Sequence, residues 1–145
     1  MKKTFLILSM IFPLTFLQSM QDEATSGENP FLLIARIQVK EGRVEDYLDI
    51  ADRVDKITQA EEPGMLFHNF DQDPSDPLRF TWSEIYENSD ALLVHFGASY
   101  AADYVAKSNE LADSFEIEIY GNLSKEAEET VRSFGFPFKH FKTTR

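Results

Sequence analysis

The chain has 145 residues, of which 43% are hydrophobic and 13 are phenylalanine, so it can form one packed domain and leaves little room for a second. Its 25 acidic and 14 basic residues give a net charge of −11, which argues against a nucleic-acid partner because phosphate binding needs clustered lysine and arginine. The lack of cysteine excludes disulfides, thiol nucleophiles and thiolate metal sites.

The N-terminus has the pattern of a secretory signal peptide. Two lysines precede an apolar run over residues 5–17, and the small residue Ser19 follows at a plausible cleavage point. We therefore predict a signal peptide at 1–19 and an exported protein, periplasmic or secreted, with an uncleaved anchor as the alternative. The run is short for a membrane span and contains Pro13, so no stable membrane insertion is expected after cleavage. The polar stretch 20–30 predicts a flexible leader.

The first half of the remaining chain predicts a strand, a helix and a hairpin. Apolar and polar residues alternate over 31–40, as in a half-buried strand. Apolar residues then recur at helical spacing to about Glu61, after which a Pro-Gly pair ends the helix. The stretches 65–72 and 78–87 predict two more strands, and the turn-forming residues between them indicate an antiparallel hairpin.

The second half predicts further elements up to the tail. A short helix capped by Asn88 comes first, and a longer helix follows to about Asp113. Alternation over 115–120 predicts another half-buried strand, and Ser124 can cap a last amphipathic helix. The tail is expected to add a short edge strand.

The predicted order is β-α-β-β-α-β, which is the α+β arrangement of ferredoxin-like domains. We assign this domain to residues 31–123 and regard 124–145 as a C-terminal helix and tail extension. Both main helices are expected to cover one face of an antiparallel sheet, so the other face needs cover. A second copy of the chain can supply it, which predicts a homodimer. A monomer with a polar second face is the alternative.

Short segments distributed over this domain resemble a known family. They are the stretch 37–42, the turn 62–64 that closes the first helix, and the segment Glu84–Asn88 followed by Ala91 and His95. In this order and spacing they resemble the antibiotic-biosynthesis-monooxygenase (ABM) family of dimeric α/β barrels. The resemblance implies a ligand pocket in each subunit, between the sheet and its helices.

The members of that family differ in activity more than in fold. Some oxidise aromatic polyketides or quinols with molecular oxygen and no prosthetic group, others degrade haem, and others isomerise a small phosphorylated compound. Haem-degrading members carry an asparagine and a tryptophan where this chain has Ala35 and Tyr86. This difference disfavours haem, and no cofactor is expected. Fold alone does not fix the chemistry.

The resemblance implies three candidate catalytic residues around the pocket, His95, Tyr86 and Glu84. His95 stands in the family's histidine position and fits a general base, since imidazole titrates near neutral pH. The alternative is a partly buried histidine bonded to a backbone carbonyl. Glu84 and Tyr86 lie two apart on a strand and therefore share a face with Trp82. The Glu84 carboxylate fits either a ligand contact or a salt bridge near the rim.

Five residues are candidate ligand contacts, namely Trp82, Tyr100, Tyr104, Asn69 and Phe67. Trp82 can stack on a flat phenolic ligand, and the two tyrosines lie four apart on one helix face. Asn69 shares a strand face with Phe67 and is expected to donate a hydrogen bond to a quinone oxygen. For the aromatic residues the alternative is packing in the core.

Together with the resemblance, which implies oxidation by molecular oxygen without a prosthetic group, these residues favour a cofactor-independent monooxygenase that acts on a small aromatic or quinol-type compound. A non-catalytic small-molecule-binding or stress-related dimer is one alternative, and an isomerase of a small carbonyl compound is another. The isomerase predicts phosphate-binding groups in the pocket. The three histidines show neither HxH nor HExxH spacing, so no metal site is predicted.

Overall fold

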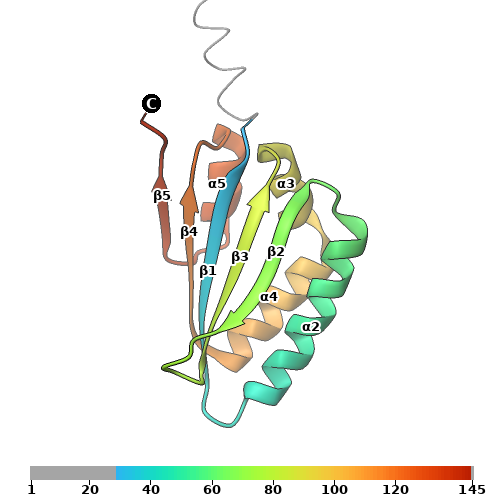
Figure 1. The fold of residues 1–145 in the computed structure, drawn as a ribbon, viewed down its shortest axis with the longest axis vertical. Coiled ribbons are helices and arrows are strands. Elements are labelled where there is room, and N and C mark those ends of the chain that lie inside the picture. The colour runs from blue at the N-terminus through green and yellow to red at the C-terminus, as the bar shows by residue number, and fades with distance from the viewer. Residues whose placement is uncertain (1–28, 145) are drawn as a thin grey trace, which may run out of the picture.

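The computed structural model describes residues 29–144, which form an α+β fold with a five-stranded sheet (Figure 1). The predicted signal peptide lies outside the described residues, as does nearly all of the predicted leader. Within residues 29–144, no helix has the length and apolar character needed to cross a membrane.

The helices and strands follow the predicted order, with one short helix between the two halves. In chain order they are β1 Phe31–Val39, α2 Val44–Glu61, β2 Met65–Gln72, β3 Arg79–Tyr86, α3 Ser89–Gly97, α4 Ser99–Leu111, β4 Ala112–Tyr120, α5 Lys125–Ser133 and β5 Phe138–Phe141.

The sheet has the strand order β2-β3-β1-β4-β5. β1 lies between β3 and β4 and pairs antiparallel with both, and β2 pairs antiparallel with β3. These four strands with α2 and α4 are the predicted ferredoxin-like arrangement, so the predicted fold class is confirmed. The tail adds β5 to the edge of β4 in the parallel direction (Figure 1). The parallel direction follows from α5, which crosses over between the two strands.

The period-two pattern of β1 decides which face of the sheet the helices cover. Phe31, Leu33, Ala35, Ile37 and Val39 are all buried. The residues between them are half-buried or exposed, because they lie on the face without helices. In Figure 1 α3, α4 and α5 lie behind the strands and α2 lies to the right of β2, so that no helix covers the front face of the sheet.

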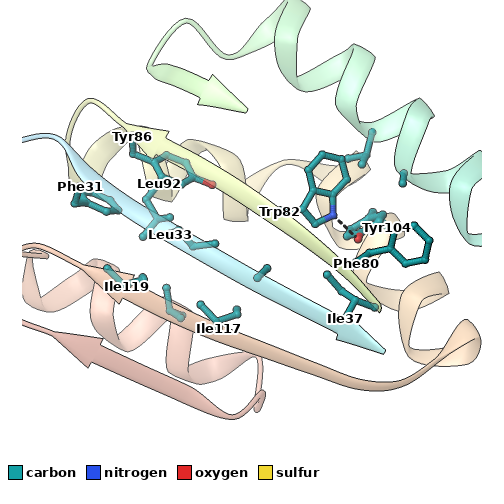
Figure 2. Close-up of a cluster of buried hydrophobic side chains, with 14 of the residues drawn as sticks. Phe31, Leu33, Ile37, Phe80, Trp82, Tyr86, Leu92, Tyr104, Ile117 and Ile119 are labelled. Carbon is teal, nitrogen blue, oxygen red and sulfur yellow. Dashed lines mark hydrogen bonds between the residues drawn. The ribbon is translucent and has the colours of Figure 1, made fainter. Parts of the chain in front are cut away.

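The core lies between the sheet and the helices and is rich in aromatic rings (Figure 2). Phe80, Trp82 and Tyr86 reach it from β3, and Leu92 and Tyr104 reach it from α3 and α4. Two short polar side chains act as N-caps of helices. The Asn88 side chain accepts a hydrogen bond from the Ala91 amide at the start of α3, and the Ser124 side chain accepts one from the Ala127 amide at the start of α5. Both predicted caps are therefore confirmed.

Gly121 follows β4 in a backbone conformation that favours glycine, with φ at +135°. A Cβ at this position would lie 2.6 Å from the Cβ of Phe31. We expect Gly121→Ala to lower the free energy of unfolding by about 1–3 kcal/mol, through backbone strain and this clash. At Gly97 a Cβ meets no atom within 4 Å, so Gly97→Ala is the matched control. Chemical denaturation measures both, and equal losses in the two variants would contradict the expectation.

Candidate active site

A small cavity of about 50 Å³ lies between the sheet and the helices. Its wall is mostly apolar and aromatic, and it includes three titratable side chains that can exchange protons, His68, Glu84 and His95. These three come from β2, β3 and α3, so the cavity is assembled from segments that are distant in sequence. A dry apolar wall with a few converging polar groups is typical of a ligand site.

The alternation of β3 brings the carboxylate of Glu84 into this cavity. Phe80, Trp82, Glu84 and Tyr86 all lie on the face that the helices cover, and all four are buried. The predicted shared face is therefore confirmed. The Glu84 side chain is only 7% exposed, so its charge needs partners within the protein.

Glu84 has two such partners. The Tyr86 hydroxyl donates a hydrogen bond of 2.6 Å to Glu84 Oε2. The His68 Nε2 atom lies 3.6 Å from Glu84 Oε1, within ion-pair distance. On its other side, His68 Nδ1 lies 2.6 Å from Asp55 Oδ1. The His68 ring also stacks on Trp82, with ring centres 4.5 Å apart. His68 is thus held between two carboxylates.

This arrangement favours the charged forms of both His68 and Glu84. Burial opposes the charge of His68, but interactions with Glu84 and Asp55 outweigh burial and raise the pKa of His68 above its ordinary value. Burial also opposes the charge of Glu84, but interactions with His68 outweigh it and lower the pKa of Glu84. Burial and the Glu84 charge raise the pKa of Tyr86, which remains a hydrogen-bond donor. The cavity therefore contains a buried ion pair.

His95 has a carboxylate partner of its own. Its Nδ1 atom lies 2.9 Å from Oε1 of Glu62, whose side chain is 3% exposed. The Tyr100 hydroxyl donates a bond of 2.6 Å to the same oxygen, and burial and Glu62 raise the pKa of Tyr100. Because a carboxylate only accepts, Nδ1 carries the proton in this contact. Its Nε2 atom has no hydrogen-bond partner within residues 29–144, so Nε2 is the nitrogen available to a ligand.

A second polar network borders the cavity at Tyr104. The Trp82 Nε1–H donates to the Tyr104 hydroxyl at 2.7 Å, the contact drawn as a dashed line in Figure 2. The hydroxyls of Tyr104 and Tyr47 lie 2.6 Å apart. Burial raises the pKa of Tyr104 to about 12, so the hydroxyl stays protonated. These bonds fix the orientation of the Trp82 ring against the cavity.

The structure brings four of the eight predicted site residues to the cavity wall, Glu84, His95, Trp82 and Tyr104. Tyr86 and Tyr100 do not line the cavity. Their hydroxyls bond to Glu84 and Glu62 behind the wall, so each positions a carboxylate rather than contacting a ligand there. The predicted roles of Tyr86 and Tyr100 at a ligand stay predictions.

Asn69 and Phe67 lie on the opposite face of the sheet and do not line this cavity, so their predicted contact with a ligand stays a prediction. Asn69 pairs with Ser83 and Phe67 pairs with Ile85, and paired residues of neighbouring strands point to the same side. Ser83 and Ile85 alternate with the buried residues of β3. Phe67 is 48% exposed there. The neighbouring His68 takes the place at the cavity that we expected for Asn69.

Three residues of the site were not predicted, namely Glu62, His68 and Asp55. Glu62 belongs to the turn that carries the family resemblance, and His68 precedes a predicted ligand contact. The signal that identifies His68 is the pairing of β2 with β3, in which His68 stands opposite Glu84. Within residues 29–144, no three His, Asp or Glu side chains are grouped so that they could hold a metal ion.

Comparison with known proteins places this site in a family context. The family model of antibiotic biosynthesis monooxygenase matches residues 30–107, which leaves the end of α4 and all of β4, α5 and β5 beyond the matched part. An uncharacterized protein of Synechocystis sp. is 28% identical over 118 residues, which cover 81% of this chain and 79% of that protein.

Solved structures agree with this match at the level of the fold. A candidate antibiotic biosynthesis monooxygenase from Caulobacter crescentus has a TM-score of 0.62 and 19% identity, covering 68% of this chain and 94% of its own. A protein of Shewanella oneidensis has a TM-score of 0.61 and 22% identity, covering 64% of this chain and 90% of its own. Because the family model spans more than half of the chain, the protein belongs to the antibiotic biosynthesis monooxygenase family.

Proposed function

We propose that the protein is a monooxygenase that oxidises a small neutral phenol or quinol with molecular oxygen, with His95 as the general base. The observation that carries this proposal is the contact of His95 with Glu62 at the edge of an aromatic cavity. It holds the imidazole in the tautomer whose free nitrogen can accept a proton. It also supplies a negative charge that stabilises the imidazolium after the transfer.

The charges around the cavity select the kind of ligand. Among the residues that line it, none is lysine or arginine, and Glu84 carries a negative charge. The cationic side chain on this wall, His68, is already paired with Glu84 and Asp55, so a phosphate ester or a carboxylate finds no unpaired positive charge there, whereas a neutral hydroxyl can donate a hydrogen bond. This composition favours a phenol over the phosphorylated substrate that the isomerase alternative requires.

The chemistry needs a base and a site that excludes water. Nε2 of His95 takes the phenolic proton, and the resulting electron-rich ring gives its electrons to oxygen. In such a reaction one ring C–H of the phenol becomes a carbonyl whose oxygen comes from O2, the phenolic C–OH becomes the second carbonyl, and the other oxygen atom leaves as water with the two hydrogens released, so that a phenol and O2 give a quinone and water. The substrate supplies all the electrons, so the protein contributes proton transfer, orientation and a dry pocket.

A homodimer is part of this proposal. The open face of the sheet carries the half-buried Leu32, Ile34 and Ile85 together with the exposed Phe67, an apolar area that a second copy can cover. We expect light scattering of the purified protein to give twice the mass of the chain. A mass that stays that of a single chain at all concentrations would contradict the dimer. Export to the periplasm or the medium remains the prediction for its location.

Oxygen uptake tests the activity. We would supply the purified protein with a panel of quinols and polyphenols, add no cofactor, and record oxygen with an electrode. Enzyme-dependent uptake with at least one neutral phenol is expected. Val94→Ala is the matched control for variants of α3, because Val94 is exposed on the same helix as His95 and should not alter the rate.

Two results would overturn the proposal. Uptake that is the same with His95→Ala as with Val94→Ala would keep an oxidase and remove His95 as its base. No uptake with any member of the panel, while phenols still raise the melting temperature, would favour the non-catalytic binding protein instead.

A further inference from the structure

The cavity is too small for the ligand that the proposed function requires. Its free space is about 50 Å³. A closed apolar cavity of about 150 Å³ is the size that holds a benzene ring, so the space here is enough for only a few water molecules. A phenol can therefore bind in this cavity only if a side chain of the wall moves out of its position.

Two aromatic side chains of the C-terminal extension occupy the space next to this cavity. Phe134 and Phe136 both line the cavity wall and both are half-buried. Phe134 packs edge-on against Phe96, with ring centres 5.0 Å apart. Phe136 stacks on Phe115 at 4.5 Å with an angle of 22° between the rings. A flat aromatic ligand would make the same kind of stacking contact with Phe115.

The extension is anchored on both sides of these two rings. Before them, α5 is packed into the core by Ala127 and Val131. After them, the Ile117 amide donates a 2.9 Å bond to the carbonyl of Pro137, and β5 pairs with β4. Between the two rings Gly135 has a φ of +75°, which turns the chain in a way that glycine adopts readily. The backbone is thus fixed, and the rings can move by rotation of their side chains.

We propose that Phe134 and Phe136, here called the aromatic plug, fill the place of the ligand ring and determine the size of the ligand that the cavity accepts. The ligand is a neutral phenol of one or two rings, and it binds by displacing Phe136, Phe134 or both. The proposal rests on the proposed function in that it takes the cavity as the ligand site. It does not require that the ligand be oxidised.

The chain contains a reporter for this cavity. Trp82 is the single tryptophan of the sequence, and it lines the cavity. We would measure quenching of its fluorescence by acrylamide, a neutral quencher, in the wild type and in Phe134→Ala and Phe136→Ala. The quenching constant should at least double in both variants, because removal of either ring opens the cavity. Phe138→Ala is the matched control, since Phe138 belongs to the same extension but does not line the cavity.

Ligand binding tests directly whether Phe134 and Phe136 determine the size of the ligand that the cavity accepts. Phenol should bind Phe136→Ala about tenfold more tightly than the wild type, which corresponds to about 1.4 kcal/mol. The two-ring compound 1-naphthol should bind the double variant Phe134→Ala/Phe136→Ala more tightly than either single variant. Benzoate should gain no affinity in any variant, because the positive charge of His68 on the cavity wall is already neutralised by Glu84 and Asp55. Phe136→Leu is a second variant for the case that Phe136→Ala does not fold, because it keeps an apolar side chain at this position. Its affinity for phenol should lie between those of the wild type and Phe136→Ala.

The results separate this proposal from the proposed function. Unchanged quenching in both alanine variants would overturn the aromatic plug, as would phenol affinities of Phe136→Ala and Phe136→Leu equal to that of the wild type. Oxygen uptake by the wild type would then still stand. Gains in quenching and in phenol affinity would support the plug even if no member of the panel is oxidised.

Discussion

Replacing His95 by alanine is expected to lower the rate of phenol oxidation by about 10²- to 10⁴-fold, the usual contribution of a general base. The variant keeps the cavity but has no group that can take the phenolic proton at Nε2. Because the hydroxyl must then ionise unaided, kcat should fall and KM should change little. Steady-state oxygen uptake measures both constants. Added imidazole should restore part of the rate, since it can occupy the vacated space and accept the proton.

Glu62 should act as a positioning residue for this base. The change Glu62→Gln keeps the size of the side chain but removes the charge, and its amide can donate to Nδ1 and stabilise the wrong tautomer of His95. We expect kcat to fall about tenfold or more, with a changed pH profile of kcat. The exposed neighbour Glu61 provides the control Glu61→Gln. Equal pH profiles for the two glutamine variants would show that Glu62 does not tune His95.

The folded protein is expected to lose stability as the pH rises above 6.5, the ordinary pKa of histidine, through the raised pKa of His68. The folded state binds the His68 proton more tightly than the unfolded chain does. The gain is complete below the ordinary pKa and disappears as His68 deprotonates. The free energy of unfolding should fall by at most about 1.4 kcal/mol per pH unit for this one proton. Urea denaturation at several pH values measures the slope.

The variant His68→Gln should flatten this dependence. It should be less stable than the wild type at pH 6, where Asp55 and Glu84 lose their positive partner, and the difference should shrink towards pH 9. Asn69→Ala, on the same strand but facing the other way, should keep the wild-type slope. A loss of stability at acid pH would be harder to assign to one residue. The lowered pKa of Glu84 predicts that the free energy of unfolding falls below pH 4.5, but the pKa of Glu128 is also lowered, to about 2, and contributes a loss of its own. An unchanged alkaline slope in His68→Gln would contradict the assignment.

The fold could be predicted because the hydrophobic pattern and the turn residues agree along the chain. The alternation of β1 and β3, the helical spacing of α2 and the caps at Asn88 and Ser124 all indicate the elements that form. The direction of β5 was not predicted, although the helix predicted between β4 and the tail is the crossover that a parallel pair of strands needs.

The site was only partly predictable because a side chain's direction depends on tertiary structure. The contact between Glu62 and His95 joins residues 33 positions apart, and a glutamate at a helix end is usually solvated. Met65 packs against the core, and a regular alternation along β2 would place Phe67 and Asn69 on the same face of the sheet as Met65. A register shift between Met65 and Phe67 adds one residue, so every later side chain turns to the other face. His68 therefore faces the core.

That shift in register also interrupts the outer edge of the sheet. β2 is an outer strand of eight residues, with Leu66 55% exposed and Phe67 48% exposed. A straight edge of this length with such side chains is a template on which strands of other molecules can assemble. The extra residue breaks the regular spacing of amide and carbonyl groups at this point. We therefore expect it to disfavour the addition of a foreign strand beside Leu66 and Phe67.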